Sequence, residues 1–376
     1  MATEISKQNR VLYLNTPLDY LTRMKGNINP SHTYRLEVLN GNAPLIRQIN
    51  DNLWIVDCPI PIFPLNKLPT AWLFDFVNKI NNKRIARRIN EVMKQFDFQR
   101  VIHIADNDIY RSFYLKELIQ PALSIYYCRD FLFYNPYWRK NGSRLEPLLA
   151  AKADMVVTNS PLLAERLRPY NPLSFSADSG VNLSLYDASK KWEIPQDMLA
   201  IKHPIIGYVG ALNSSRLDLE LIYRIAIDRP DYRFVMVGPE DDAFAQHQIH
   251  QLPNVTFLGK KPVDQLPAYI NSFDVCLNIQ LINEITKVNY PLKIDEYLAM
   301  GKPTVATTTQ TMRTIFSEQV HLPSNKEEYL VAIDQALTEV DDDHLRLQRI
   351  AFAKTHSWEN IVDRVYSYIQ EAEKAR

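Results

Sequence analysis

The sequence predicts a two-domain α/β protein in which parallel strands are covered by helices. Short runs rich in β-branched and aromatic residues alternate with helical patterns through both halves of the chain, which is typical of parallel sheets with crossover helices. A chain of 376 residues is also longer than one hydrophobic core usually serves. Its contents of 23% charged and 46% hydrophobic residues are values of a folded globular protein.

The expected strands fall into two sets. In the first half they are residues 11–15, 53–58, 101–104, 124–128 and 155–158, and in the second half they are residues 205–209, 234–237, 255–258, 275–279 and 304–307. Residues 182–203 between the sets are polar and are interrupted by Pro195, so the sequence places a domain boundary there. We therefore expect one open sheet in residues 1–190 and a second in residues 191–355.

Composition and charge argue against several classes of protein. Lys and Arg together number 43, as do Asp and Glu, and no basic tail is present, so nucleic-acid binding is not expected. Three scattered cysteines show no spacing typical of a metal site or a disulfide framework. The N-terminus lacks the apolar core of a signal peptide, and no apolar run approaches the ~20 residues that cross a bilayer. These features favour a cytoplasmic protein.

One expected helix, around residues 83–94, combines an apolar stripe with many cations. The stripe comprises Ile85, Ile89, Val92, Met93 and Phe96, and the cations are Lys83, Arg84, Arg87, Arg88 and Lys94. Such a helix can dock on an anionic membrane surface, which would make the protein peripheral at the inner face of the membrane. It can equally be a surface helix whose charged face is solvated.

Candidate ligand contacts are sought just after each strand, because ligands of open α/β sheets bind beyond the carboxyl ends of the strands. After the strand that ends near residue 279, a loop is expected to run to Tyr290. Pro291 then suits the first turn of a helix. Gly301 is expected to end that helix, with a proline two residues later barring any continuation.

The start of this helix is a candidate site for a diphosphate. The N–H groups near Leu292 and Lys293 would offer donors to an anion, and Lys293 would add a full positive charge. One turn further, Glu296 is placed to accept hydrogen bonds from a ribose diol. A second cation, Arg216, lies in the polar loop that follows Gly210. Gly210 and that loop can also be ordinary turn and cap residues.

Taken in order along the chain, these motifs resemble the donor domain of family 4 glycosyltransferases of the GT-B fold. The resemblance rests on strand–Gly210–loop–Arg216, residues 234–239 with Gly238, residues 255–259 with Gly259, Pro291–Leu292–Lys293, and residues 296–303. It implies two Rossmann-like domains facing across a cleft, with a closing helix over residues 356–376 that crosses back to the first domain. It also implies transfer of a sugar from a nucleotide donor of UDP or GDP type, with retained anomeric configuration and with neither metal nor cofactor.

The resemblance also implies roles for single residues. Arg216, Lys293 and the helix start at Leu292 would meet the charge that leaves with the diphosphate, where well-placed donors lower the barrier. Glu296 corresponds to the ribose-binding glutamate of the family. The turn that begins at Gly259 and includes Lys260 corresponds to the turn that contacts the base.

One departure from the family concerns a glutamate. Members usually carry a second glutamate eight residues before the one at Glu296, where this chain has Val288. The nearest upstream acid is Glu284, in a loop that looks lengthened, and it either approaches the sugar or is a solvated loop carboxylate. An alternative function therefore stays open, that of a catalytically silent partner protein that binds the nucleotide-sugar.

Further candidates lie in the first domain. His103 and Asp106, two catalytic candidates, are expected where a strand ends at the cleft. The acceptor-side candidates are Asp130, which follows the next strand, and Asp19 in the first loop. The acceptor would be a saccharide or a lipid-linked sugar, as in the synthesis of cell-surface polysaccharides or glycoconjugates. Each of these polar residues can also be a turn or cap residue, and His103 can belong to the core.

Overall fold

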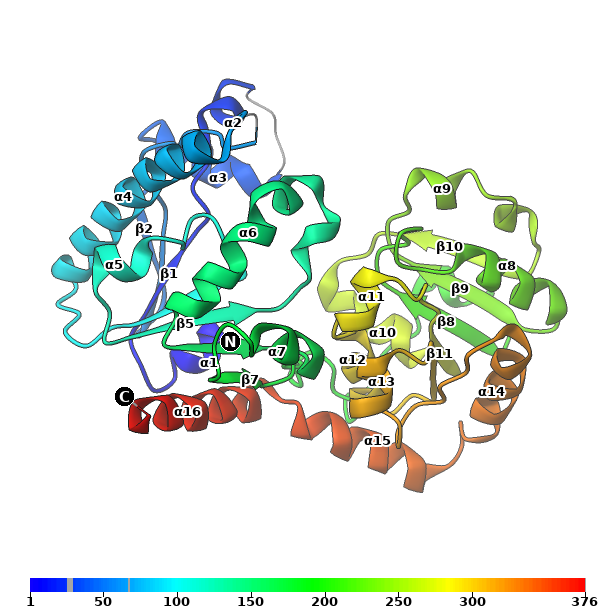
Figure 1. The fold of residues 1–376 in the computed structure, drawn as a ribbon. Coiled ribbons are helices and arrows are strands. Elements are labelled where there is room, and N and C mark those ends of the chain that lie inside the picture. The colour runs from blue at the N-terminus through cyan, green and yellow to red at the C-terminus, as the bar shows by residue number, and fades with distance from the viewer. Residues whose placement is uncertain (26–29, 67, 376) are drawn as a thin grey trace. The chain divides into compact units, whose positions relative to one another are not determined.

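The computed structural model describes residues 1–25, 30–66 and 68–375 (Figure 1). The chain forms two compact units. Unit 1 comprises Met1–Ala177 together with Val362–Arg376, and unit 2 comprises Asp178–Ile361. Each unit has its own sheet system and its own core, which confirms the α/β class predicted from the sequence.

Unit 2 is built on one five-stranded parallel sheet. Its strands are β8 (Ile205–Val209), β9 (Arg233–Val237), β10 (Val255–Gly259), β11 (Val275–Asn278) and β12 (Thr304–Ala306), in the order β10-β9-β8-β11-β12. From β8 the chain proceeds first to one side of the sheet and then, after β10, to the other. The topological switch point, where open α/β sheets bind ligands, therefore lies between β8 and β11.

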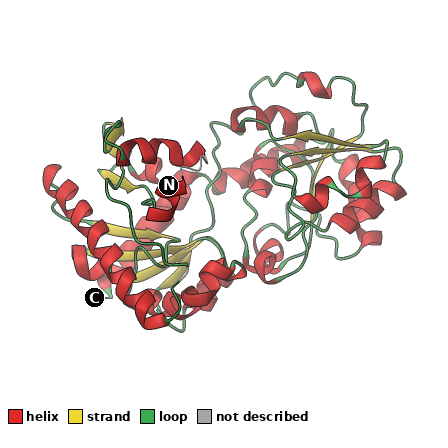
Figure 2. Cartoon of the chain, turned by 90° about the horizontal axis from the view of Figure 1, so that it is seen from above, coloured by secondary structure: helices red, strands yellow, loops and turns green. Residues whose placement is uncertain are grey.

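Helices cover both faces of this sheet (Figures 1 and 2). They are α8 (Leu219–Asp228), α9 (Asp242–Ala245), α10 (Leu266–Asn271), α11 (Glu284–Val288), α12 (Lys293–Ala299), α13 (Gln310–Ile315), α14 (Lys326–Thr338) and α15 (Asp343–Thr355). One core joins β-strand residues such as Val209 to α10, α12 and α13, and the other joins residues such as Ile206 to α8 and α14. Alternate strand residues thus serve opposite cores, as the pleat of a strand requires.

Unit 1 contains two hydrogen-bonded sheets where the sequence predicted one. The first has the order β1-β3-β2 and consists of β1 (Val11–Leu14), β3 (Leu53–Val56) and the antiparallel β2 (Ile46–Asn50). The second has the order β4-β5-β6-β7 and consists of β4 (Ile102–Asp106), β5 (Leu123–Cys128), β6 (Met155–Thr158) and β7 (Ser174–Ser176), all parallel. Strands β2 and β7 were not predicted.

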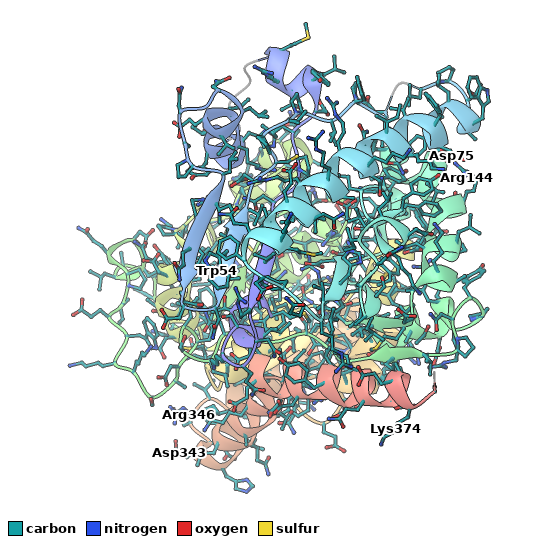
Figure 3. All side chains as sticks on the ribbon, turned by 90° about the vertical axis from the view of Figure 1, so that its left-hand side faces the viewer. Trp54, Asp75, Arg144, Asp343, Arg346 and Lys374 are labelled. Atoms are coloured by element: carbon teal, nitrogen blue, oxygen red, sulfur yellow. The ribbon has the colours of Figure 1, made fainter. Side chains whose placement is uncertain are left out.

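The helices of unit 1 are α1 (Ala2–Ile5), α2 (Tyr20–Lys25), α3 (Pro30–Leu39), α4 (Ala71–Gln95), α5 (Leu115–Ile119), α6 (Pro136–Lys152), α7 (Pro161–Leu167) and the last part of α16 (Trp358–Lys374). Helices α4 and α6 are tied by Arg144, whose two terminal nitrogens donate to the Asp75 carboxylate at 2.8 and 3.0 Å (Figure 3). Such a two-point contact fixes the orientation of both side chains.

Helix α16 closes unit 1. Val362, Val365 and Ile369 on one of its faces are buried. The ring of Tyr368 stacks on Phe175 of β7 with centroids 4.5 Å apart, and its hydroxyl donates to a β7 carbonyl oxygen at 2.9 Å. The last helix therefore belongs to the same unit as the first strands.

The boundary between the units lies earlier than the sequence indicated. Unit 1 ends at Ala177 and not at residue 190, because the next segment folds with unit 2. Val181 and Tyr186 are part of a core of unit 2, and the Val181 N–H donates to the carbonyl oxygen of His356 at 2.9 Å.

The apolar stripe of α4 is not available to a membrane. Ile85 and Val92 are each 1% exposed, and Ile85 packs in a core cluster with Ile62 and Leu115. The stripe therefore holds α4 on unit 1, because an amphipathic helix buries its apolar face in its own domain. Within the described part of the chain, no helix is both long and apolar enough to cross a bilayer.

Candidate functional site

Three glycines line the carboxyl edge of the unit 2 sheet. Gly210 follows β8, Gly238 follows β9 and Gly259 ends β10, and all three have positive φ angles, of 146°, 154° and 67°. The Gly238 N–H donates to the Gly259 carbonyl oxygen at 2.9 Å. A Cβ atom on Gly238 would lie 1.8 Å from the Gly210 carbonyl oxygen. The backbones thus approach here as only glycine permits.

Lys293 lies over the end of β8. Its Nζ is 3.0 Å from the hydroxyl of Tyr208 and 4.7 Å from the centre of that ring. A Cβ atom on Gly210 would stand 3.0 Å from the same Nζ. In the described part of the chain, Lys293 forms no ion pair with a carboxylate. The switch point therefore carries a cation that makes no salt bridge with an acidic side chain.

Arg216 is the second cation at this edge. Its loop is fixed on one side by Ser214, whose N–H and hydroxyl both donate to Asp241 at 2.7 Å. On the other side, the Arg216 carbonyl oxygen accepts from the N–H of Leu281 at 2.9 Å. Its guanidinium has no side-chain partner among the residues that the structure describes. The loop backbone is held while the cationic group stays free.

The start of α12 differs from the expectation. The helix begins at Lys293 and not at Pro291, and the N–H of Leu292 donates to the Tyr290 carbonyl oxygen at 3.1 Å. That tight turn uses an N–H group that was expected to be open to an anion. The N–H of Ile294 likewise donates to the Pro291 carbonyl oxygen at 2.9 Å. Of the two N–H groups that were expected to face an anion, that of Leu292 is thus engaged within the turn.

The end of α12 is as predicted. Gly301 has a φ of 73°, its N–H donates to the Leu298 carbonyl oxygen at 2.9 Å, and the N–H of Lys302 donates to the carbonyl oxygen of Tyr297 at 3.0 Å. This left-handed glycine stops the helix and returns the chain to β12.

Glu296 is partly buried one turn into α12. Burial raises the pKa of its carboxyl group above the ordinary value, while a hydrogen bond from Tyr186 and the nearby charge of Lys293 act in the opposite direction. A partly desolvated carboxylate held by a single tyrosine has acceptor capacity left for a ligand hydroxyl.

Glu284 lies on a helix where the sequence suggested a loop. It is the exposed first residue of α11, which begins with a capping box made by Asn283 and Thr286. The Asn283 side chain also donates to the Ser215 carbonyl oxygen at 2.9 Å, so α11 starts beside the Arg216 loop. Val288, where the family carries a glutamate, is the last residue of α11.

The turn after β10 presents an exposed Lys260. The next residue, Lys261, is engaged, because its Nζ pairs with Asp197 at 2.6 Å and Asp197 also accepts from Tyr269 at 3.0 Å. Of the two lysines, only Lys260 is available to a ligand at this turn.

The glycine edge and its cations fall within a region that known proteins share. Residues 203–339, the part that carries the glycines, both cations and Glu296, match the family described as Glycosyl transferases group 1. Unit 2 thus carries a glycosyl transferases group 1 domain.

A curated relative is the putative teichuronic acid biosynthesis glycosyltransferase TuaH of Bacillus subtilis (strain 168), which is 24% identical over 241 residues. The match covers 61% of this chain, and the chain spans 60% of the length of that relative.

Solved structures share the fold over the whole chain. Sucrose-phosphate synthase from Thermosynechococcus elongatus matches with a TM-score of 0.67 and 16% identity, covering 100% of this chain and 92% of that one. Anabaena HepE in complex with UDP and glucose matches with a TM-score of 0.61 and 13% identity, covering 97% and 100%. The two-unit architecture is therefore the GT-B fold of these glycosyltransferases.

The site residues predicted in unit 1 differ in where they lie on its sheet. His103 is the second residue of β4, because that strand runs two residues beyond the predicted end, and its Nδ1 lies 3.2 Å from the Ser124 hydroxyl. It is thus away from the carboxyl edge of the sheet. Asp106 ends β4 at that edge and pairs with Arg129 at 2.6 Å.

The two remaining acceptor-side candidates have local roles. Asp19 accepts from the N–H of Thr22 at 2.7 Å and so caps the first turn of α2. The N–H of Asp130 donates to the Asn107 side chain at 3.4 Å, beside the end of β5. Asp19 is therefore engaged as a cap residue, whereas Asp106 and Asp130 lie at the carboxyl edge where a ligand would bind.

One residue of the group 1 domain was missed by the sequence analysis. Asn278, at the carboxyl end of β11, is 1% exposed, and neither atom of its amide has a hydrogen-bond partner within the described residues. The signal was present, because a polar residue in an apolar buried strand requires explanation.

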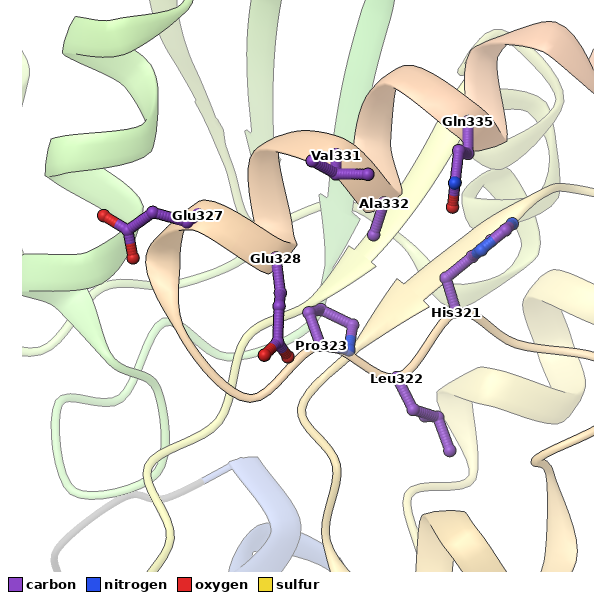
Figure 4. A pocket seen from close by; sticks show the side chains of 8 residues that line it. All are labelled: His321, Leu322, Pro323, Glu327, Glu328, Val331, Ala332 and Gln335. Atoms are coloured by element: carbon purple, nitrogen blue, oxygen red, sulfur yellow. The ribbon is translucent and has the colours of Figure 1, made fainter.

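The charge of its lining argues against another hollow in unit 2 as the diphosphate site. This hollow has a volume of 420 Å³ and lies between α14 and the segment that leads into this helix, lined by Glu327, Glu328 and His321 among others (Figure 4). His321 pairs with Glu339 at 2.7 Å. Two carboxylates and no free cation disfavour a diphosphate there. Among the described residues, no cluster of His, Cys, Asp and Glu could hold a metal ion.

Proposed function

We propose that this protein transfers a sugar from a nucleoside diphosphate sugar to a saccharide or lipid-linked acceptor. The observation that carries the proposal is the pair of cations, Lys293 and Arg216, at the switch point of the unit 2 sheet without an acidic partner. A diphosphate supplies the charge that both lack, and a close backbone at Gly210 lets it approach.

The chemistry follows from where charge develops. The bond between C1 of the sugar and the diphosphate oxygen breaks, the acceptor oxygen bonds to C1, and the acceptor proton leaves to solvent or to a base. Negative charge grows on the departing diphosphate, and fixed cations there lower the barrier by about 3 to 4 kcal/mol for one well-placed group. We propose retention of configuration and no need for a metal ion or cofactor.

UDP is the nucleotide that we propose first, ahead of GDP, because a solved relative of the same fold is in complex with UDP. Glu296 would accept hydrogen bonds from the ribose, and the turn of Gly259 and Lys260 would contact the base. For the acceptor we propose a cell-surface polysaccharide or glycoconjugate precursor, since the relative TuaH is named for teichuronic acid biosynthesis.

The test compares nucleotide binding and donor turnover in the wild type and three variants. Thermal shift with UDP and GDP would name the nucleotide, since a ligand at a hundred times its dissociation constant stabilises by about 2.7 kcal/mol. Arg216→Ala and Lys293→Ala are expected to lower transfer or donor hydrolysis by two orders of magnitude or more, and Glu296→Ala to weaken donor binding. Full activity in all three variants would overturn the site.

A catalytically silent binding protein is the second candidate, and Val288 favours it. No carboxylate replaces the family glutamate at that position, and the nearest acid, Glu284, is exposed on α11. If the protein binds a donor but neither hydrolyses it nor transfers its sugar to any acceptor, it is the silent binding protein and not the enzyme. Loss of turnover in Glu284→Gln with unchanged UDP affinity would decide for the enzyme.

We propose that unit 1 contacts an anionic membrane through the exposed face of α4. Lys83, Arg87 and Lys94 line a surface pocket of 450 Å³, and Trp72 and Phe76, near the start of the same helix, are 70% and 60% exposed. Cations and interfacial aromatics on one helix suit acidic headgroups. The test replaces Lys83, Arg87 and Lys94 together by Glu and measures binding to acidic vesicles. If the triple variant binds as tightly as the wild type, the proposed placement at the cytoplasmic face of the membrane is wrong.

A further inference from the structure

A buried polar network joins α12 to the segment that precedes α16. Asp295, on α12, is 0% exposed. Its Oδ2 accepts from the hydroxyl of Tyr290 at 2.5 Å, and its Oδ1 lies 2.8 Å from Nδ1 of His356. Tyr290 is 4% and His356 is 5% exposed, so a bound nucleotide has no direct access to the three side chains.

This network differs from the contacts of the proposed donor ligands. Lys293 is held by the hydroxyl of Tyr208, and Glu296 by Tyr186, and both contacts are partly exposed. A diphosphate and a ribose would compete for these same groups. Asp295 lies between the two in sequence, and its own bonds are sealed from the ligand.

Two buried anchors thus remain on α12 when a ligand binds. The first is Tyr297, whose hydroxyl accepts from the Val209 N–H at 2.9 Å and fixes the helix to β8. The second is Asp295. Two anchors on different sides of a two-turn helix prevent it from rotating about its axis, and such rotation would displace both Lys293 and Glu296.

The second anchor, through His356, contacts the segments where the chain passes from one unit to the other. The His356 carbonyl oxygen accepts from the Val181 N–H at 2.9 Å, and Val181 pairs with Ser357. A Cβ atom on Gly180 would lie 2.3 Å from the Trp358 ring, so these two segments are in close contact. Unit 1 ends three residues before Gly180 and resumes at Val362.

We propose that Asp295, Tyr290 and His356 are positioning residues that hold Lys293 and Glu296 in register for the donor and couple donor binding to the two crossing segments. The proposal rests on the proposed donor site. It assigns no contact with the substrate to the three residues. They act through α12, whose first turn follows directly from Tyr290.

The test compares matched substitutions at two tyrosine–aspartate pairs of unit 2. Tyr290→Phe removes the hydroxyl that bonds Asp295. Tyr232→Phe is the control, because the Tyr232 hydroxyl donates to Asp334 at 2.6 Å just before β9, at the opposite edge of the sheet. His356→Gln and Asp295→Asn complete the set.

The first readout is UDP affinity by calorimetry, well below the unfolding temperature. Tyr290→Phe, His356→Gln and Asp295→Asn are expected to weaken UDP binding at least tenfold, and Tyr232→Phe less than twofold. The second readout is hydrogen exchange. UDP is expected to slow exchange of the Val181 and Ser357 amides in the wild type and in Tyr232→Phe, but not in His356→Gln.

The outcomes separate the two proposals. If the wild type binds neither UDP nor GDP, the donor site itself fails. If the wild type binds UDP and Lys293→Ala weakens it, but Tyr290→Phe and His356→Gln bind as tightly as Tyr232→Phe, the network is only structural and the positioning role is wrong. A lower unfolding temperature with unchanged UDP affinity would equally contradict the positioning role. Should Asp295→Asn fail to fold, the other two variants still decide.

Discussion

At the scale of single residues, Lys293 and Arg216 differ from three other cations of unit 2 in their surroundings. Lys261, Arg229 and Lys326 each face a carboxylate, at 2.6, 2.7 and 2.7 Å. No carboxylate pairs with Lys293 or Arg216 in the described part of the chain. Those three cations are thus engaged in ion pairs, whereas Lys293 and Arg216, near the switch point, have no carboxylate partner to displace when a ligand binds.

Glu296 should make donor binding pH-dependent. Because burial raises the pKa of its carboxyl group, the proton binds at a higher pH than to an ordinary glutamate. Acidification therefore weakens Glu296 as an acceptor for the ribose hydroxyls. As the pH is lowered from neutrality towards 4.5, the ordinary pKa of a glutamate, we expect UDP affinity to fall more steeply in the wild type than in Glu296→Gln. Titration of the UDP phosphate is common to both proteins, so equal slopes in calorimetry would contradict the assignment.

His103 should act on stability and not on transfer. Burial lowers its pKa from 6.5 to about 4, so between these values the unfolded chain binds a proton that the folded chain does not. The contribution of His103 to the free energy of unfolding is therefore fully present above pH 6.5 and is lost as the pH falls towards 4. His103→Asn is expected to flatten that dependence in urea denaturation and to change kcat less than threefold. A loss of kcat by two orders of magnitude would restore His103 as a catalytic candidate.

At the scale of elements, the sequence located most strands because their apolar runs are short and bounded by turns. Residues 155–158 and 205–209 match β6 and β8 at both ends. Strand β2 was missed because Arg47 and Gln48 interrupt its apolar pattern, which an antiparallel edge strand tolerates. Helix α11 was missed because five residues carry too little periodicity to be recognised.

The sequence predicted the candidate site only where its residues lie close together along the chain. Lys293 and Glu296 lie on one short helix and Gly301 follows its end, so their order along the chain indicated the helix and the roles proposed for its two charged residues. The bond of Asp295 to His356 joins residues 61 positions apart, and no local pattern reveals it. The turn that occupies the Leu292 N–H also depends on backbone angles that the residue types do not specify.

The glycine edge of the sheet gives a prediction at this scale. Gly238→Ala would bring a Cβ atom 1.8 Å from the Gly210 carbonyl oxygen, whereas Gly259→Ala would meet no atom within 4 Å. We expect Gly238→Ala to cost about 3 to 5 kcal/mol of stability, since backbone must move, and Gly259→Ala about 1 to 2 kcal/mol for its positive φ alone. Urea denaturation measures both. Similar costs would show that the close approach at Gly238 does not matter.

At the scale of the whole molecule, the chain leaves unit 1 at Ala177 and returns at Val362. The proposed donor site lies entirely in unit 2, and α16 stabilises unit 1. Each unit should therefore unfold with some independence, and one unfolding free energy will not describe the protein.

A substitution in α16 tests this division. Val365 is 4% exposed in unit 1, so Val365→Asp buries a carboxylate and is expected to destabilise that unit by about 3 kcal/mol or more. UDP binding should stay within twofold of the wild type, while transfer is lost as unit 1 unfolds. Calorimetric unfolding and UDP titration on the same sample check both. Loss of UDP binding in step with unit 1 would contradict a donor site confined to unit 2.

The most direct measurement is calorimetric titration of UDP into the wild type, Lys293→Ala and Lys326→Ala. Lys326 is the control, because its charge is already paired with Asp228 at 2.7 Å. We expect the wild type and Lys326→Ala to bind UDP with affinities within twofold, and Lys293→Ala to bind at least tenfold more weakly, by about 1.4 kcal/mol or more. Equal affinity of all three proteins would contradict a diphosphate site at the start of α12.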